Sequence, residues 1–240
     1  MSKITPQIKH KKYLIAALIG FAAVEILFIH FMYNVAFSLF SYICVISSCL
    51  FCSLLSDGSR SWLFTQLGLI GTVGADFFLV FLPNQQRVVG MIFFCSVQLF
   101  YFMRIYSEDN NQVRKRVNLI LRSVASVAML IITPLVLGFR VDAVSILSMF
   151  YYVHLICNVL FAFLNFKSSR IFALALLAFI LSDTLLGFQY LSDYFLIPRG
   201  SFIYYAIFYG RKICYPFYIL SQILIPISMV SRKLKKIQMS

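Results

Sequence analysis

The chain has 240 residues, of which 61% are hydrophobic and only 12% are charged. Soluble domains carry about 25% charged residues, so this composition excludes an ordinary soluble domain and predicts an integral membrane protein. The net charge of +13 is compatible with nucleic-acid binding. The lysines and arginines, however, lie in short gaps between apolar runs, which is typical of loops that face the cytoplasm. We therefore expect no nucleic-acid partner.

Apolar runs long enough to cross a bilayer as helices follow one another along the chain. Residues 201–212, with three tyrosines, Arg211 and Lys212, are expected to form an interfacial stretch that leads into the last run. The connections are very short, so consecutive helices should lie antiparallel, as in a bundle. The sequence therefore predicts an all-α, polytopic membrane helix bundle of about eight transmembrane helices. We place them near residues 13–31, 35–55, 62–82, 88–106, 117–137, 141–164, 169–188 and 213–231.

One integral membrane domain, residues 1–240, is expected because no Gly/Ser-rich or Pro-rich linker divides the chain. Residues 1–12 and 232–240 would form basic tails. The first apolar run follows a basic segment, as in a signal peptide. It is too long for one and lacks a small-residue cleavage site, so we interpret it as a retained helix.

The distribution of basic residues predicts that both termini lie in the cytoplasm. The membrane would be the bacterial inner membrane, or the endoplasmic reticulum in a eukaryote. On the opposite side we expect only Arg87, Arg140, Arg199, Arg211 and Lys212. On the cytoplasmic side we expect Lys3, Lys9, Lys11, Lys12, Arg60, Arg104, Arg114, Lys115, Arg116, Arg122, Lys167, Arg170, Arg232, Lys233, Lys235 and Lys236.

The cysteines and histidines predict neither a disulfide framework nor a metal site. Cys49-x-x-Cys52 has a redox or metal spacing, but it lies in an apolar run without a second such pair. We interpret all six cysteines as small apolar packing residues. A zinc-dependent membrane amidohydrolase needs several intramembrane histidines, and only His30 and His154 lie near the predicted helices. No metal, nucleotide or redox cofactor is predicted.

Two aspartates, Asp76 and Asp183, lie inside apolar runs of a chain that has only eight acidic residues. A carboxylate within the hydrocarbon layer costs several kcal/mol, so such a residue indicates a functional site. Both aspartates fall about two thirds of the way along outward-running helices, and Glu25 lies at a comparable depth in a third. A shared polar chamber is one interpretation. The other is that each acid bonds to a neighbouring helix and stabilises packing.

Other polar residues recur at helical spacing and are expected to face the same interior. Thr72 precedes Asp76 by one turn. The role of Gly68, Gly71 and Gly74 stays open, because small residues permit either close helix packing or access for a lipid chain. One polar stripe in the fourth predicted span comprises Gly90, Phe94, Gln98 and Tyr101, and another in the last span comprises Tyr215, Tyr218 and Gln222.

These stripes and acids occur in a recognisable order. Gly74-Ala75-Asp76 is followed by Gly90, Phe94, Gln98 and Tyr101; then come Phe179, Ser182, Asp183 and Leu186, and finally Tyr218 and Gln222. The pattern resembles the YhhN family of multi-pass membrane proteins, which includes the lysoplasmalogenases. It differs in three ways, the first being that it has no counterpart of the Lys-Pro often seen early in the second helix of the family. An alanine separates Gly74 from Asp76, and Gln98 stands where the family usually has histidine. A glutamine can orient water or a lipid head group but carries no titratable proton.

The resemblance implies hydrolysis of the vinyl ether of a lysoplasmalogen, a membrane lysophospholipid. It also implies a catalytic pair, Asp76 and Asp183. One carboxyl group would protonate the alkene and the other would stabilise the cation and activate water, as in two-carboxylate glycosidases. We expect the two carboxyl groups within about 10 Å of each other. The residues expected to bind substrate are Gln98, Tyr101, Ser182, Tyr218 and Gln222.

Two other functions stay open at this point. Buried acids also form proton relays, so a proton-coupled or lipid transporter is an alternative to the hydrolase. The similar settings of Asp76 and Asp183, four helices apart, hint at an internal repeat of the kind that transporters contain. A non-catalytic member of the family is the third possibility. Oligomeric state is not predicted by the sequence.

Overall fold

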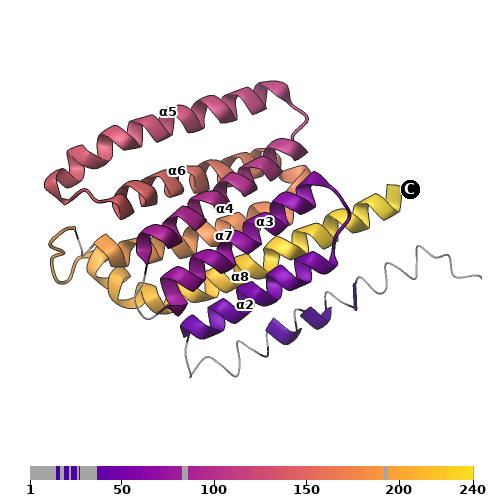
Figure 1. Ribbon diagram of the computed structural model, residues 1–240, viewed down its shortest axis with the longest axis horizontal. Helices are drawn as coiled ribbons and strands as arrows, with labels where there is room; N and C mark the ends of the chain where they lie inside the picture. The colour runs from indigo at the N-terminus through magenta and orange to yellow at the C-terminus, as the bar shows by residue number, and fades with distance from the viewer. Residues whose placement is uncertain are drawn as a thin grey trace, which may run out of the picture.

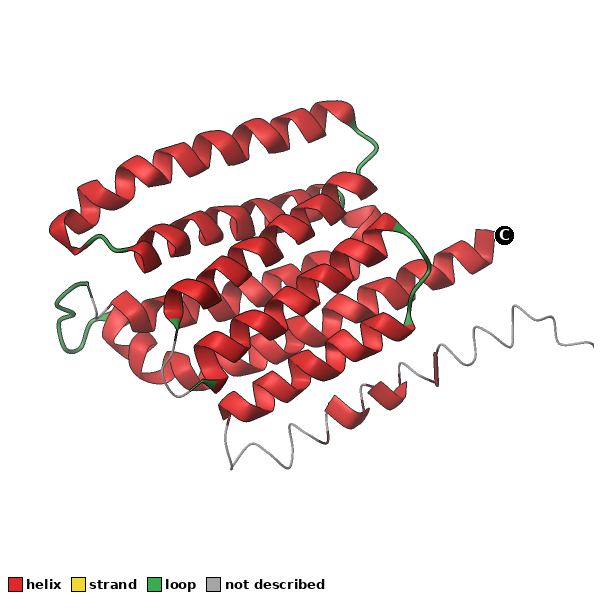
Figure 2. Ribbon diagram, viewed as in Figure 1, coloured by secondary structure: helices red, strands yellow, loops and turns green. Residues whose placement is uncertain are grey.

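The chain is mostly helical in the part that the computed structural model describes, which comprises residues 15–16, 19–21, 23–25, 27, 37–82, 86–191 and 194–239. No strand occurs among these residues, which confirms the all-α prediction (Figure 2). The elements are α2 (Phe37–Leu54), α3 (Arg60–Asp76), the π-helix η1 (Phe77–Phe81), α4 (Arg87–Glu108), α5 (Gln112–Leu137), the 3-10 helix η2 (Gly138–Arg140), α6 (Ala143–Leu164), α7 (Phe166–Leu191) and α8 (Phe202–Met239).

Five of the described helical segments are long and apolar enough to cross a membrane, which supports a multi-pass membrane protein. They match the third to seventh predicted spans and are Arg60–Phe81, Arg87–Glu108, Gln112–Leu137, Ala143–Leu164 and Ser169–Tyr190. Leu39–Leu54 and Cys214–Val230 are shorter apolar helical segments at the second and eighth predicted spans. The first predicted span, 13–31, lies largely outside the described residues. The expected number of eight spans is therefore not confirmed.

Six helices close into a ring around a shared interior. Each of α2, α3, α4, α6, α7 and α8 packs against the next, and α8 packs back against α2. Helix α5 packs against α6 at the edge of the bundle, where it forms the outermost helix in Figure 1. Large apolar side chains such as Val113, Ile120 and Leu135 are exposed on α5. In a membrane protein such a surface faces lipid, so the ring interior is the place where polar groups can be sheltered.

The expected interfacial stretch at residues 201–212 is part of the last helix. Helix α8 begins at Phe202 and continues to Met239 without a break in helical assignment. Two prolines, Pro216 and Pro226, lie inside it. Helix α7 contains one irregular residue, Ser169, with φ −138° and ψ 49°, close to its start.

The turn between α4 and α5 is closed by an ion pair outside the predicted hydrocarbon region. Arg114 Nη2 donates to Asp109 Oδ1 (2.6 Å), and Arg114 Nη1 donates to the Leu164 carbonyl oxygen (3.0 Å) at the end of α6. The hydrogen bonds from Arg114 hold the pKa of Asp109 below its usual value. Asp109 therefore stays ionised at neutral pH, and the pair joins the ends of three helices.

The glycines of α3 allow close packing against α4, which decides the question left open by the sequence. A Cβ atom at Gly68 would lie 2.3 Å from Tyr101 Cε1, and one at Gly71 would lie 2.9 Å from Val97 Cγ2. A Cβ atom at Gly74 would lie 2.8 Å from the Phe93 ring. Side chains of α4 thus occupy the space that the glycines leave.

We predict that Gly68→Ala destabilises the protein. The Tyr101 ring is fully buried and packs edge-on against Phe172 at 5.5 Å, so it cannot move aside freely. Overpacking of this kind costs about 1–3 kcal/mol. Gly187→Ala is the matched control, since no atom lies within 4 Å of the added Cβ. Thermal unfolding in detergent should show a lower Tm for Gly68→Ala alone; equal Tm values would contradict the packing argument.

Candidate functional site

Asp76 lies at the junction of α3 and the π-helix η1, with only 3% of its surface exposed. Its Oδ2 accepts a hydrogen bond of 2.7 Å from the hydroxyl of Tyr218 in α8. The π-helical hydrogen bond from Leu82 N–H to the Phe77 carbonyl (3.0 Å) immediately follows it. π-Helical segments occur frequently at functional sites. The sequence has no residue pattern that predicted this irregularity.

Asp183 lies in α7 and is held by a second tyrosine. The hydroxyl of Tyr151, in α6, donates a hydrogen bond to Asp183 Oδ2. The next residue, Thr184, contacts the hydroxyl of Tyr152. Both predicted catalytic aspartates therefore have the same arrangement, in which one carboxylate oxygen accepts a hydrogen bond from a tyrosine of a different helix.

Two phenylalanines connect the two tyrosines. The Phe179 ring lies 5.8 Å from the Tyr218 ring and 6.3 Å from the Phe94 ring, and Phe94 lies 5.5 Å from Tyr151. The two acids thus border one aromatic cluster, formed by Phe94, Tyr151, Phe179 and Tyr218, in the ring interior. The expected spacing of about 10 Å between the carboxyl groups stays a prediction.

The residues expected to bind substrate are all buried on interior faces of three helices. Gln98 follows Phe94 by one turn in α4, and Gln222 follows Tyr218 by one turn in α8; both are fully buried. Gln222 Nε2 donates to Ser221 Oγ at 3.2 Å. Tyr101 is fully buried over Gly68, and Ser182, beside Asp183, is 3% exposed.

Glu25 has contacts that favour the packing interpretation. It is fully buried, and its carboxylate accepts a hydrogen bond from Ser47 Oγ of α2. The contacts that join Asp76 to Asp183 run through α8, α7, α4 and α6 and do not involve Glu25.

The structure adds two polar residues that the sequence analysis did not single out, Tyr151 and Asn158. Both lie on the buried side of α6, seven residues apart, with Asn158 fully buried. Asn158 Nδ2 donates to Gln98 Oε1 at 2.9 Å. Their spacing of two helical turns in an apolar span was a usable signal, because it places both on one helix face.

A model of the YhhN family matches residues 33–229. The chain belongs to the YhhN family. The resemblance inferred from the motifs is thereby confirmed, and the matched range of the YhhN model includes both aspartates and all residues expected to bind substrate. No curated protein and no solved structure is similar enough to the chain to be matched.

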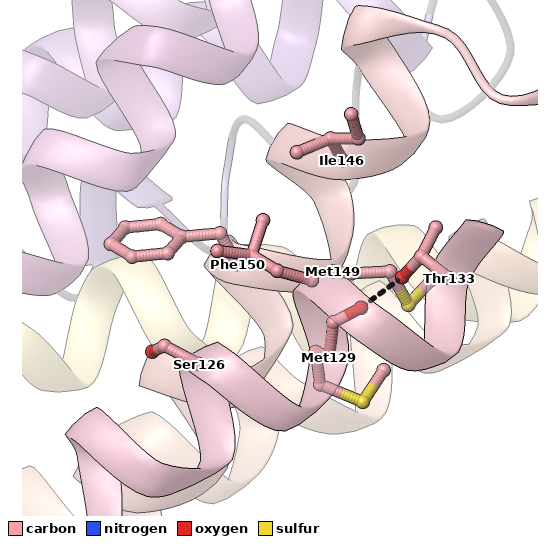
Figure 3. Close-up of a pocket in the computed structure, with 7 residues that line it drawn as sticks. Ser126, Met129, Thr133, Ile146, Met149 and Phe150 are labelled. Carbon is pink, nitrogen blue, oxygen red and sulfur yellow. Dashed lines mark hydrogen bonds between the residues drawn. The ribbon is translucent and has the colours of Figure 1, made fainter.

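A recess lies between α5 and α6, but its side chains are unsuited to acid–base chemistry. Figure 3 shows side chains of both helices around it, and none of them is ionisable. It also lies on the α5 side of α6, whereas the aspartates border the ring interior. The lining residues are Ser126, Met129, Leu130, Thr133, Ile146, Met149 and Phe150.

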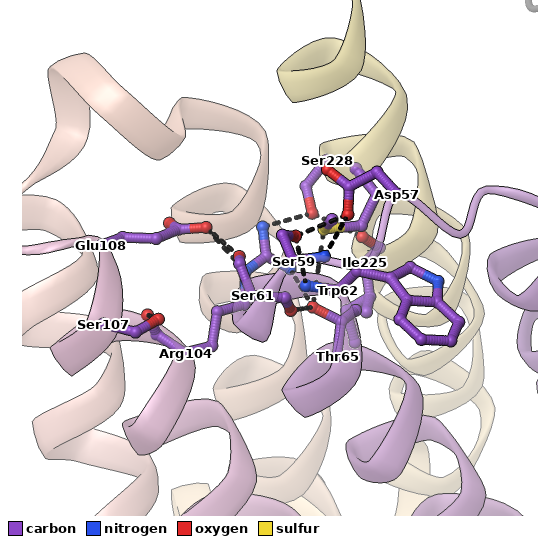
Figure 4. Close-up of polar contacts among 11 residues, drawn as sticks. Asp57, Ser59, Ser61, Trp62, Thr65, Arg104, Ser107, Glu108, Ile225 and Ser228 are labelled. Atoms are coloured by element: carbon purple, nitrogen blue, oxygen red, sulfur yellow. Dashed lines mark hydrogen bonds and ion pairs between the residues drawn. The ribbon is translucent and has the colours of Figure 1, made fainter. Parts of the chain in front are cut away.

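A second polar cluster of the YhhN chain surrounds Arg104, which is 1% exposed (Figure 4). Its Nη1 donates to Thr65 Oγ1 (3.0 Å), and its Nη2 donates to Ser228 Oγ (2.8 Å). The guanidinium lies 3.7 Å from the centre of the Phe172 ring. Nε lies 3.5 Å from Glu108 Oε1. Arg104 therefore joins α3, α4, α7 and α8 and is a buried connection between helices, although its charge was assigned to the cytoplasmic side from the sequence.

Proposed function

We propose that the protein hydrolyses the vinyl ether of a lysoplasmalogen to a fatty aldehyde and a glycerophospho-base, using Asp76 and Asp183 as an acid–base pair. One observation carries the proposal: a buried aspartate, Asp76, and a partly buried one, Asp183, are each hydrogen-bonded to a tyrosine and border one aromatic cluster. Membership of the YhhN family, which the sequence analysis linked to this reaction, supports the same conclusion.

The chemistry divides between the two carboxyl groups. One, protonated, transfers its proton to the β-carbon of the vinyl ether, and the alkene electrons form the new C–H bond. The α-carbon then belongs to an oxocarbenium ion, which water attacks while the other carboxylate accepts a water proton. The resulting hemiacetal loses its hydroxyl proton, the C–O bond to glycerol breaks, and the glycerol oxygen is protonated.

The aromatic cluster suits the cationic intermediate and the acyl chain. Ring faces stabilise a nearby cation and offer an apolar surface to the hydrocarbon. Because each tyrosine hydroxyl contacts Oδ2, proton transfer is assigned to Oδ1 of either aspartate.

Mass spectrometry of lipids incubated with the purified protein tests the proposal. We expect a fatty aldehyde and a glycerophospho-base from a lysoplasmalogen, and no cleavage of a saturated lysophospholipid. Lipid movement across proteoliposomes without these products would instead favour a transporter. An absence of both would favour a non-catalytic protein.

Both termini are proposed to lie in the cytoplasm, on the basis of the basic residues near the ends of the chain. A reporter fused after Ser240 should therefore be active only if it is of a type that works in the cytoplasm. A paired reporter that works only outside the cytoplasm is the control, and activity of that reporter would reverse the proposed orientation.

A further inference from the structure

A chain of buried hydrogen bonds runs from α5 through α6 to Gln98 in α4. Arg122 Nη2 donates to Asn158 Oδ1 at 2.7 Å. Asn158 Nδ2 donates to both the side-chain and the backbone oxygen of Gln98, each at 2.9 Å. The exposed fractions are 4% for Arg122 and 0% for the other two residues. Arg122 also donates from Nε to Asn118 Oδ1 at 2.6 Å, which fixes the guanidinium.

The hydrogen bonds that link Arg122, Asn158 and Gln98 can run in only one direction, from Arg122 as the donor toward Gln98 as the acceptor. A guanidinium has donors and no acceptor, so the oxygen of the Asn158 amide must face Arg122. The NH₂ group of Asn158 must then face Gln98, and Gln98 must present its oxygen to it. The NH₂ group of Gln98 consequently points away from α6.

This NH₂ group is an unused donor in the ring interior. Gln98 Nε2 is buried and has no hydrogen-bond partner within the described part of the chain. A buried donor without a partner is costly, and a site that binds a polar ligand gives it one. Gln98 lies one turn from Phe94, whose ring belongs to the aromatic cluster between the two aspartates.

We propose that Asn158, fixed by Arg122, is a positioning residue that holds Gln98 with its NH₂ group ready to bind an acceptor oxygen of the lysophospholipid. This inference rests on the proposed function, since it assigns a ligand to the same site. The acceptor is a phosphate oxygen or the free glycerol hydroxyl. We exclude the ether oxygen because it gains positive charge when the β-carbon is protonated, and a donor there would oppose that step.

Three variants test whether the side-chain amide of Gln98 presents its NH₂ group to the interior. Gln98→Met keeps the size and removes the donor. Asn158→Asp presents only acceptors, so Gln98 must turn its NH₂ group toward Asp at position 158 and its oxygen toward the interior. Neutral histidine has one donor and one acceptor. Gln98→His can therefore accept from Asn158 and still donate into the interior, which makes it the conservative replacement.

The readout is binding of a 1-O-alkyl lysophospholipid, which has no vinyl group to cleave, to protein in nanodiscs. Gln98→Met and Asn158→Asp should each raise Kd, by about 10- to 100-fold if the acceptor is a charged phosphate oxygen and by about tenfold if it is the neutral glycerol hydroxyl. Gln98→His should stay within about threefold of the parent. Thr133→Val removes a buried hydroxyl on α5, away from this chain of hydrogen bonds, and is the matched control.

A double-mutant cycle separates positioning from general structural damage. If Asn158 acts through Gln98, Asn158→Asp should add no further loss of binding in a Gln98→Met background. Independent, additive losses would overturn the positioning role. Should Asn158→Asp fail to fold, Asn158→Leu takes its place in the same cycle.

The outcomes for this inference and for the proposed function are distinguishable. A parent that binds and cleaves lysoplasmalogen, together with a Gln98→Met variant of unchanged Kd, overturns the inference alone. A parent that binds the alkyl lipid but cleaves nothing overturns the hydrolase and leaves the binding role of Gln98 to be decided by the variants. A parent that does neither overturns both.

Discussion

Asp76→Asn and Asp183→Asn should each reduce vinyl-ether hydrolysis by about 10²–10⁴-fold or more, the range expected for loss of a general acid or base. Asparagine keeps the size of the side chain and can still accept the tyrosine hydrogen bond seen at each carboxylate. It cannot transfer a carboxyl proton. The change also removes a charge that burial penalises, so the fold should be retained. Aldehyde release by purified variants, measured beside their Tm values, checks both parts.

Glu25→Gln provides the matched control for these two variants. Glu25 is buried, as Asp76 is, and it accepts a hydroxyl hydrogen bond as both aspartates do, but from Ser47 of α2. Its replacement should change turnover far less than either aspartate replacement. Near-normal turnover in both aspartate variants would disprove the site assignment. Equal losses in all three variants would point to a general requirement for buried acids instead of a catalytic pair.

The sequence was most informative where an ionisable residue lies within an apolar run. A carboxylate in an apolar run is costly, so Asp76 and Asp183 were noticeable from sequence alone. Helical spacing then placed Tyr218 one turn from Gln222, and Tyr218 proved to be the hydrogen-bond partner of Asp76. Spans were likewise predictable from length and apolar composition, and α4 differs from its predicted bounds by one or two residues.

The sequence was less informative about partners and irregular backbone. Helix period places Tyr151 and Asn158 on one face, but nothing local says that this face meets α7 and α4. The π-helix after Asp76 is formed by five apolar residues that would also suit an ordinary helix. The prediction of membrane orientation from lysines and arginines assumes that each of them lies in a loop. It therefore could not show that Arg104 and Arg122 are buried between helices, where tertiary contacts satisfy them.

Arg104→Met should lower the stability of the bundle by about 3–5 kcal/mol, the cost typical of removing one partner from a buried ion pair. Thr65 and Ser228 keep hydrogen bonds to backbone carbonyls after the change. Glu108 does not keep its ion pair: its carboxylate, 11% exposed, loses the cation one turn before it. The stacking of the guanidinium on Phe172 is lost as well. Thermal or denaturant unfolding in detergent measures the total effect.

The double variant Arg104→Met/Glu108→Gln shows which loss dominates. Glutamine removes the charge of Glu108 and can still accept the hydrogen bond from Ser61 Oγ. If the lost ion pair between Arg104 and Glu108 causes most of the destabilisation, the double variant should recover at least half of the stability that Arg104→Met loses. If the double variant is as unstable as the single one, the loss comes from the helix-to-helix contacts of the guanidinium with Thr65, Ser228 and Phe172. A single variant as stable as the parent would contradict a structural role for Arg104.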